Sequence, residues 1–411
     1  MKKKFLCDIS NREYSSFLEY GPMPIANNYD KRNSHYRYNC VVGVCKKDKI
    51  FKNLNNINEK VLFNNNYPYK SSISANFSNY LKKTADSLFQ DFVKKKPNHK
   101  KSFIIEVGSS DGVFLNEFRK KNIFHLGIEP TLNNHLLAKE KGVNSINKFL
   151  NFETSKYIIG KYGKADLIFA TNVIGHINDI NKTFKSIKNL LKNDGFFIFE
   201  NIYLADLIKN NSFDQLYDEH IYTLSATAVL NISKKFNLNL FKIQKTKIQG
   251  GSLRYFISKD PLIKINKSVS RFVEKEKNTL RLSKVDILNF QKRNYFFKNK
   301  FRRTIQSLRN EDKKIVGIGA SAKSTFLINF CGFNNSDISC IYDNSIDKPG
   351  KKLPGTNIII KKQLLFTREK FDYVIVFAWN HFEEIYKKYS SYKNMKKVKW
   401  IIPNNKIEII N

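Results

Sequence analysis

The chain has 411 residues, with 72 Lys and Arg against 36 Asp and Glu, and a formal net charge of +36. This length allows two or three domains with sizeable cores, and the five cysteines, an odd number, do not indicate a disulfide framework. No apolar run reaches the roughly 18 residues of a membrane span, and no long apolar segment follows Lys2-Lys3-Lys4, so we expect a cytoplasmic protein.

The positive charge is spread along the chain instead of forming one basic stripe. Lysine runs are short, as in Lys94-Lys95-Lys96, and they accompany frequent Asn and Ile, a mixture typical of a biased genome. Because no basic patch has interleaved aromatic residues, we do not expect DNA or RNA as the substrate. A diffuse positive field would favour a small anionic ligand.

The first glycine turn lies in FIIEVGSSDG, residues 103–112. A run typical of a buried strand ends in Glu106, and Gly108 and Gly112 allow close backbone approach before the N-terminus of a helix. The spacing is not the G-x-G-x-x-G of a dinucleotide site, and carboxylates at Glu106 and Asp111 would repel phosphate. The turn therefore predicts a cationic cofactor without phosphate, S-adenosylmethionine.

Three further strands follow this turn. HLGIEP (125–130) ends in Glu129, about twenty residues downstream, which is the usual offset for an acid that accepts ribose hydroxyls. ADLIFATNVIGHI (165–177) and NDGFFIFEN (193–201) continue an alternation of strand and helix that predicts a doubly wound α/β sheet. The residues expected to contact the cofactor are Glu106, Gly108, Ser109, Asp111, Gly112, Glu129 and Asn172.

A second glycine turn lies at residues 313–325 and reads Gly317-x-Gly319-x-x-Ala322, closer to the dinucleotide fingerprint. The next strand ends in the acid Asp343. Read alone, this turn predicts NAD, so an NAD-dependent oxidoreductase or epimerase stays an alternative. No acid and base pair suited to hydride transfer is evident in this half.

A series of motifs spans nearly the whole chain in order. It comprises GPMPIANNY (21–29), YPYKSSISANF (67–77), EVGSSDG, the strand ending in IEP, TNVIGHI, YDEHIYTLS (217–225), IQGGSLRYFIS (248–258), GIGASAKSTFLINFCGF (317–333), YDNSIDKPGKKLPGT (342–356) and FAWNHFEEI (377–385). This series resembles the sugar C-methyltransferases that act on nucleotide-linked 4-keto-6-deoxyhexoses.

The resemblance implies three domains. They are a small zinc-ribbon-like N-terminal domain at 1–60, a methyltransferase domain at 61–260 and a Rossmann-like domain at 261–411 that holds a nucleotide-diphosphate-linked 4-keto deoxysugar. The two larger domains would both be doubly wound. The identity of the sugar, the carbon methylated, the nucleotide and the oligomeric state stay open.

C-methylation beside a ketone needs a general base and donors that stabilise an enolate oxygen. We expect His220 to be the base, with Glu219 or another acid holding its ring, since histidine titrates near neutral pH. The candidate catalytic residues are Tyr69, His176, Tyr217, Glu219 and His220. For the substrate we expect Arg254, Lys323 and Asp343, with Lys323 beside the diphosphate.

The resembled family carries two C-x-x-C pairs that hold a structural zinc. Here Ser10 stands where the partner of Cys7 should be, and Asp48 where the partner of Cys45 should be. A closed structural site needs four good ligands, so we expect substoichiometric zinc or none. Two other residues are open as substitute ligands, Cys40 and His35.

Two other classes remain as alternatives. A non-catalytic scaffold is disfavoured by the intact Tyr217, Glu219 and His220. A nucleic-acid methyltransferase would need a motif of the Asn-Pro-Pro-Tyr type after the fourth strand, where this chain has Asn172-Val173-Ile174-Gly175.

Overall fold

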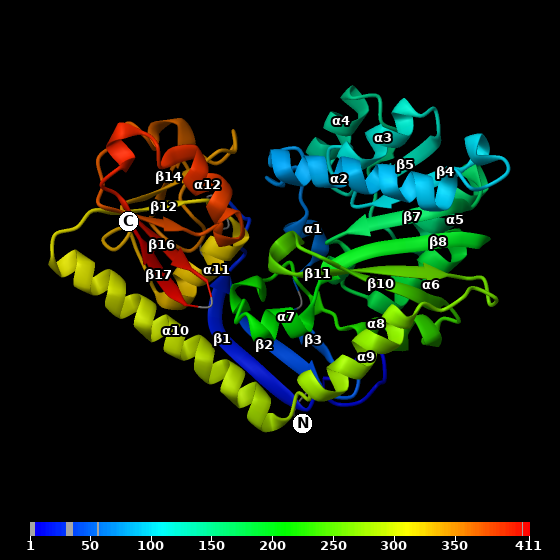
Figure 1. Cartoon of the computed structure of the whole chain (residues 1–411), viewed down its shortest axis with the longest axis horizontal. Coiled ribbons are helices and arrows are strands. Elements are labelled where there is room, and N and C mark those ends of the chain that lie inside the picture. Colours follow the sequence, from blue (N-terminus) through cyan, green and yellow to red (C-terminus); the bar gives the residue numbers. More distant parts are fainter. Residues whose placement is uncertain (1–4, 30–35, 56, 405) are drawn as a thin grey trace.

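The computed structural model describes residues 5–29, 36–55, 57–404 and 406–411. In this part of the chain the strands form three sheets (Figure 1). The central sheet lies on the right of Figure 1, the C-terminal sheet on the left, and the N-terminal strands below and between them. The predicted α/β class is confirmed.

The N-terminal sheet is antiparallel and has the order β1-β2-β3-β9. Its first three strands are β1 (Ser16–Pro24), β2 (Arg37–Cys45) and β3 (Ile50–Asn53). The fourth strand, β9 (Tyr222–Thr223), lies inside the YDEHIYTLS motif and begins two residues after His220. The N-terminal sheet therefore fixes one end of that motif.

The central sheet has the order β10-β11-β8-β7-β4-β5-β6. Its strands are β4 (Phe103–Val107), β5 (Phe124–Ile128), β6 (Ser145–Ile146), β7 (Ala165–Thr171), β8 (Leu191–Ile202), β10 (Asn239–Thr246) and β11 (Ser252–Ser258). Strands β4 to β8 are parallel, and β11 and β10 add an antiparallel edge. All five residues of β4 are buried, as a central parallel strand requires.

The helices of the first two thirds of the chain connect and cover these strands. They are α1 (Glu59–Leu62), α2 (Ala75–Leu88), α3 (Val113–Lys120), α4 (Leu132–Glu140), α5 (Phe152–Tyr162), α6 (Ile180–Leu190), α7 (Leu204–Lys209), α8 (Ala226–Lys235) and α9 (Lys267–Thr279). The alternation of strand and helix gives the doubly wound architecture that the sequence predicts.

The C-terminal sheet is a second doubly wound sheet, with the order β14-β13-β12-β15-β16-β17. Its strands are β12 (Ile315–Ile318), β13 (Cys340–Asp343), β14 (Ile359–Lys362), β15 (Tyr373–Val376), β16 (Lys399–Pro403) and the antiparallel edge strand β17 (Ile407–Ile410). Helices α11 (Ala322–Cys331) and α12 (Phe382–Tyr389) belong to this part.

Two helices lead into this sheet. Helix α9 ends at Thr279, and α10 (Lys284–Asn310) begins after a break in which Leu282 has a φ of 52°. Ser283 and Asp286 form a capping box that starts the second helix. Helix α10 then runs along the lower left edge of the molecule (Figure 1).

One hydrophobic core joins the three parts. Leu18 of β1, Phe213 from the central part and Phe326 of α11 belong to the same cluster of buried residues. The three sheets therefore do not pack as separate globules, and the domain boundaries stay predictions.

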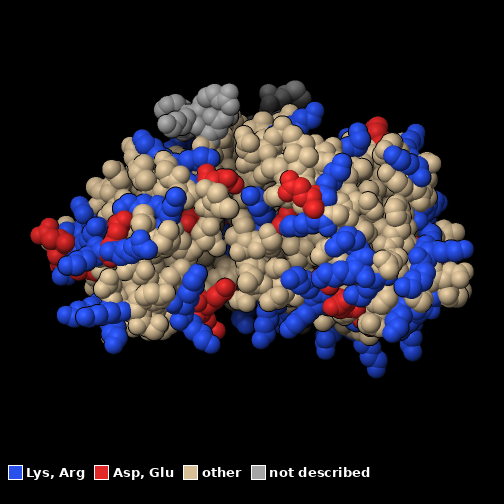
Figure 2. All heavy atoms as spheres, turned by 90° about the horizontal axis from the view of Figure 1, so that it is seen from above, with Lys and Arg blue, Asp and Glu red and all other residues tan. Residues whose placement is uncertain are grey.

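Among the described residues no helix combines the length and apolar character that crossing a bilayer needs. Figure 2 shows one face of the molecule, with Lys and Arg side chains scattered across both its left and right halves and Asp and Glu among them.

Candidate functional site

The main cavity, of about 590 Å³, lies where the central and C-terminal parts meet. Both glycine turns line it, since Gly108 follows β4 and Gly319 follows β12. Each turn lies at the point where its sheet reverses strand order, the usual ligand position in such folds. A Cβ on Gly108 would come within 2.5 Å of the Val173 side chain, so the close approach of β4 and β7 requires glycine here.

Glu129 braces the first turn and lines the cavity. Its Oε2 accepts a hydrogen bond from the Ser110 backbone N–H at 2.8 Å, and its Oε1 accepts one from the Thr131 N–H at 2.9 Å. Asn172 lines the same wall with a φ of 53°. Gly108, Glu129 and Asn172 therefore line one cavity, and their role in binding a cofactor stays a prediction.

Four other residues expected at the cofactor do not line this cavity, and their contact with the cofactor stays a prediction. The Asp111 carboxylate turns away to Lys141, with 2.6 Å between Oδ2 and Nζ. Glu106 is buried, and burial raises the pKa of its carboxyl well above the usual range, as do the charges of Glu129 and Asp111. Gly112 and Ser109 serve packing: a Cβ on Gly112 would meet Val143, and the Ser109 side chain lies against Gly127.

Asp343 repeats the construction of Glu129 in the C-terminal part. Its Oδ2 accepts from the Ala320 N–H at 2.8 Å, and its Oδ1 accepts from the Ser345 N–H at 2.9 Å and hydroxyl at 2.7 Å. Both Asp343 and Lys323 line the cavity. The Lys323 Nζ lies 4.7 Å from the Trp379 ring centroid, and burial lowers the pKa of Lys323.

His220 is held by a backbone carbonyl and not by Glu219, which corrects the sequence expectation. Its Nδ1 lies 2.6 Å from the Gln215 oxygen, which can only accept, so we assign the ring proton to Nδ1. Nε2, 2.9 Å from the Tyr217 hydroxyl oxygen, is then the acceptor for the tyrosine proton. The geometry gives a Tyr217–His220 pair in which Nε2 carries no proton and can take one up through the tyrosine hydroxyl.

A row of aromatic rings continues from this pair along the cavity. The His220 and His176 rings stack with centroids 5.0 Å apart, and Phe63 stacks on His176 at 5.9 Å. Burial lowers the pKa of His176 to about 4, and lowers that of His220 well below its usual value, helped by the charges of His176 and Lys323. Both imidazoles are therefore neutral at pH 7.

Glu219 faces the cavity beside this pair. Its Oε1 accepts from the Asn27 side-chain amide at 2.7 Å, and its Oε2 accepts from the Tyr67 hydroxyl at 2.8 Å. Burial raises the pKa of Glu219 to about 7. Tyr69, 44% exposed, also lines the cavity.

Arg254 does not line the cavity, and its role as a substrate ligand stays a prediction. Its Nε lies 2.7 Å from the Glu200 Oε1, and both side chains are buried. Its Nη2 donates to the Thr84 hydroxyl at 2.8 Å and to the Tyr80 hydroxyl at 3.1 Å. The guanidinium therefore ties β11 to β8 and α2.

The sequence analysis missed several cavity residues. They are Asn27, Phe63, Tyr67 and Lys348. Asn27 and Tyr67 lie inside two of the motifs that carried the resemblance, but nothing in a single sequence says that those segments reach the catalytic loop.

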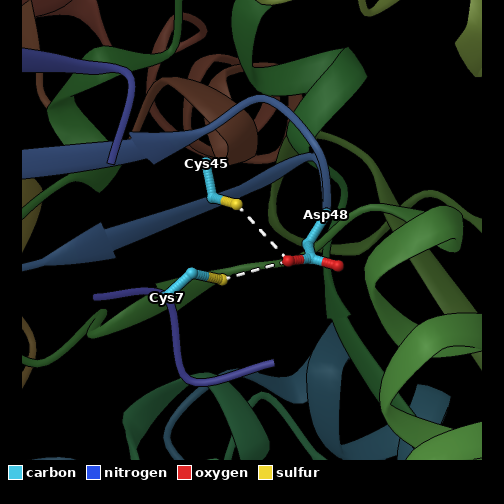
Figure 3. Close-up of side chains that lie close together, drawn as sticks. All are labelled: Cys7, Cys45 and Asp48. Atoms are coloured by element: carbon cyan, nitrogen blue, oxygen red, sulfur yellow. Dashed lines mark hydrogen bonds between the residues drawn. The ribbon is translucent and has the colours of Figure 1, made fainter. Parts of the chain in front are cut away.

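The predicted metal position is a compact cluster of Cys7, Cys45 and Asp48 (Figure 3). Both thiols donate to the Asp48 Oδ2, at 3.3 Å from Cys7 and 3.4 Å from Cys45, and the Asn231 amide donates to Oδ1 at 2.9 Å. The buried Cys40 instead donates to a backbone oxygen at Leu216. His35 lies outside the described residues.

This donor set does not complete a structural zinc site. It offers two thiols and one carboxylate, and in the sequence a serine, Ser10, stands where the partner of Cys7 would be. We expect protein purified without chelator to hold well under one zinc per chain by elemental analysis. The double variant Ser10→Cys/Asp48→Cys, which restores four thiolates, should hold close to one.

The single variant Cys40→Ser is the matched control for the zinc measurement, since Cys40 lies outside the cluster. It should leave the zinc content unchanged. One tightly held zinc per wild-type chain would contradict this expectation and show that Asp48, or the substitute ligand His35, completes the site.

Comparison with known proteins matches two family models. Residues 77–243 match the methyltransferase domain, and residues 247–404 match the C-methyltransferase C-terminal domain. The C-methyltransferase NovU of Streptomyces niveus is 25% identical over 378 residues, which cover 91% of this chain and 89% of NovU.

Solved structures give lower similarity. Magnesium protoporphyrin IX methyltransferase from Synechocystis PCC 6803 is 11% identical, with a TM-score of 0.35 over 44% of this chain and 82% of that chain. An S-adenosylmethionine-dependent methyltransferase from Clostridium acetobutylicum ATCC 824 is 15% identical, with a TM-score of 0.33 over 44% and 90% of the two chains.

Proposed function

Because this chain is an S-adenosylmethionine-dependent C-methyltransferase, we propose that it methylates a carbon beside the ketone of a nucleotide-linked 4-keto deoxysugar. We place this reaction in the cytoplasm. The observation that carries the proposal is the Tyr217–His220 pair, which faces a cavity shared by two nucleotide-type turns. NovU, the relative along most of the chain, is itself named a C-methyltransferase.

The charges on the cavity wall suggest how two ligands share it. The central side presents Glu129, which suits the ribose of a cationic cofactor. The C-terminal side presents Lys323 and Lys348 near the N-terminus of α11, where a diphosphate is favoured by charge and by free backbone N–H groups. The cofactor would therefore lie against the first turn and the sugar nucleotide against the second.

The proposed chemistry begins with removal of a proton beside the ketone. His220 Nε2 is the proton acceptor, and Tyr217, which bonds it, either carries the proton across or donates to the enolate oxygen. The ring of His176 forms no hydrogen bond with the described residues and lines the cavity as a neutral donor, with Tyr69 nearby. S-adenosylmethionine, which Gly108 and Glu129 would hold, would supply the methyl group as a sulfonium and would leave as the neutral thioether S-adenosylhomocysteine.

The test is a product assay with purified protein, S-adenosylmethionine and a nucleoside-diphosphate 4-keto-6-deoxyhexose. We expect a product heavier by one methylene group, with the new methyl on a ring carbon by NMR. The matching nucleotide sugar with a 4-hydroxyl in place of the ketone should not react, because its neighbouring protons are not acidic. Turnover with NAD in place of S-adenosylmethionine would favour the oxidoreductase alternative.

A further inference from the structure

The two oxygens of Glu219 are each fixed by a group from another part of the chain. Asn27 lies three residues after the end of β1, and Tyr67 lies in the stretch before α2. Their donors reach Glu219 over sequence separations of 192 and 152 residues. A carboxylate oxygen can accept about two hydrogen bonds, so each oxygen keeps a free lone pair at the cavity.

The electrostatic surroundings of Glu219 are mixed. Titratable groups face Glu219 from four segments. Asp218 and Tyr217 belong to its own loop, and Tyr67 lies in the stretch before α2. Tyr29 lies after β1, and Lys348 lies in the loop after β13. Lys348 is the cation in this set. Its Nζ donates to the Ala320 carbonyl at 2.8 Å and lies 3.8 Å from the Asp343 Oδ1.

We propose that Asn27 and Tyr67 are positioning residues that hold the Glu219 carboxylate as a fixed, charged acceptor for the substrate. The inference rests on the proposed function for the identity of that substrate. A buried carboxylate without these two donors would have Lys348 alone to stabilise its charge, and desolvation would favour the protonated form. A protonated Glu219 would donate where the substrate needs an acceptor.

The first experiment needs no substrate and follows melting temperature against pH in a double-mutant cycle. Because Glu219 has a pKa near 7, its carboxyl is protonated at pH 5.5 and charged at pH 8.5. Asn27→Leu should therefore lower the melting temperature more at pH 8.5 than at pH 5.5. In the Glu219→Gln background, the loss should be the same at both pH values.

The matched control is Arg37→Ala. Arg37 also joins the N-terminal and C-terminal parts, through bonds of 2.9 Å to the Asn329 side chain and to the Gly355 carbonyl, and it does not line the cavity. Arg37→Ala should lower the melting temperature by the same amount at pH 5.5 and at pH 8.5. If Asn27→Leu behaves as Arg37→Ala does, the contact is structural and the inference is overturned.

The second experiment follows kcat/KM against pH with the 4-keto substrate. Asn27→Leu and Tyr67→Phe each remove one hydrogen-bond donor to the charged Glu219 carboxylate. In each variant the acidic limb of the kcat/KM profile should therefore move to higher pH by about one unit. Arg37→Ala should keep the wild-type limb. Equal loss of activity at all pH values would contradict a positioning role. The melting cycle could depend on pH as expected while the protein fails to methylate the sugar nucleotide. That result would overturn the proposed substrate but would still support the role of Asn27.

Discussion

His220→Asn is expected to bind cofactor and sugar nucleotide but to lose the chemical step by about 10²–10⁴-fold, the usual contribution of a positioned general base. The amide cannot take up a proton, whereas the His220 Nε2 carries none in the ground state and faces Tyr217 at 2.9 Å. Deuterium exchange isolates this step from methyl transfer. With a non-transferable cofactor analogue in deuterated water, wild-type enzyme should label the carbon beside the ketone, and His220→Asn should not.

Tyr217→Phe is the companion variant for the exchange experiment. It should retain part of the exchange if the hydroxyl only supports the enolate, and lose nearly all of it if the proton passes through the tyrosine. Exchange at the wild-type rate in His220→Asn would place the base elsewhere. Glu219, with a pKa near 7, would then be the first candidate, followed by His176 and Tyr69.

Arg254→Met is expected to lower the free energy of unfolding by about 3–5 kcal/mol, because it leaves the charge of Glu200 buried without its ionic partner. Denaturant titration at pH 7 measures this directly. Adding Glu200→Gln to Arg254→Met should recover a large part of the loss, since no uncompensated charge remains.

An exposed ion pair provides the contrast for Arg254. The Lys277 and Glu274 side chains are 63% and 66% exposed, so Lys277→Met should change the free energy of unfolding by less than about 1 kcal/mol. If Arg254→Met instead kept the wild-type stability and raised the KM for the sugar nucleotide, the result would support Arg254 as a substrate ligand.

The strands and turns could be predicted because their signals are local. The residues Phe103–Ile105 are apolar and a glycine turn follows them closely, and the buried position of the strand follows from that pattern. Glu129 directly follows β5 and Asp343 ends β13, so the topology alone brings both acids beside the turns.

The partners of charged side chains could not be predicted. Asp111 and Arg254 were assigned to ligands because they lie in the right segments, but Lys141 and Glu200 satisfy them instead. An ion pair depends on which side chains meet after folding, and a single sequence does not specify that meeting. For the same reason the sequence did not reveal the role of Asn27, because its partner Glu219 lies 192 residues away in the chain.

The fourth strand of the N-terminal sheet has a bearing on how the enzyme can be divided. Phe51 of β3 pairs with Thr223 of β9, directly after the loop that carries His220. This pairing crosses the domain boundary that the sequence predicts at residue 60, so residues on both sides of the boundary hold the loop. A fragment beginning at residue 61 would keep the glycine turn at Gly108 but lack the wall that holds this loop. The cofactor-binding fold and the reactive loop are thus not one transplantable module, and any chimera must inherit the N-terminal sheet together with the central one.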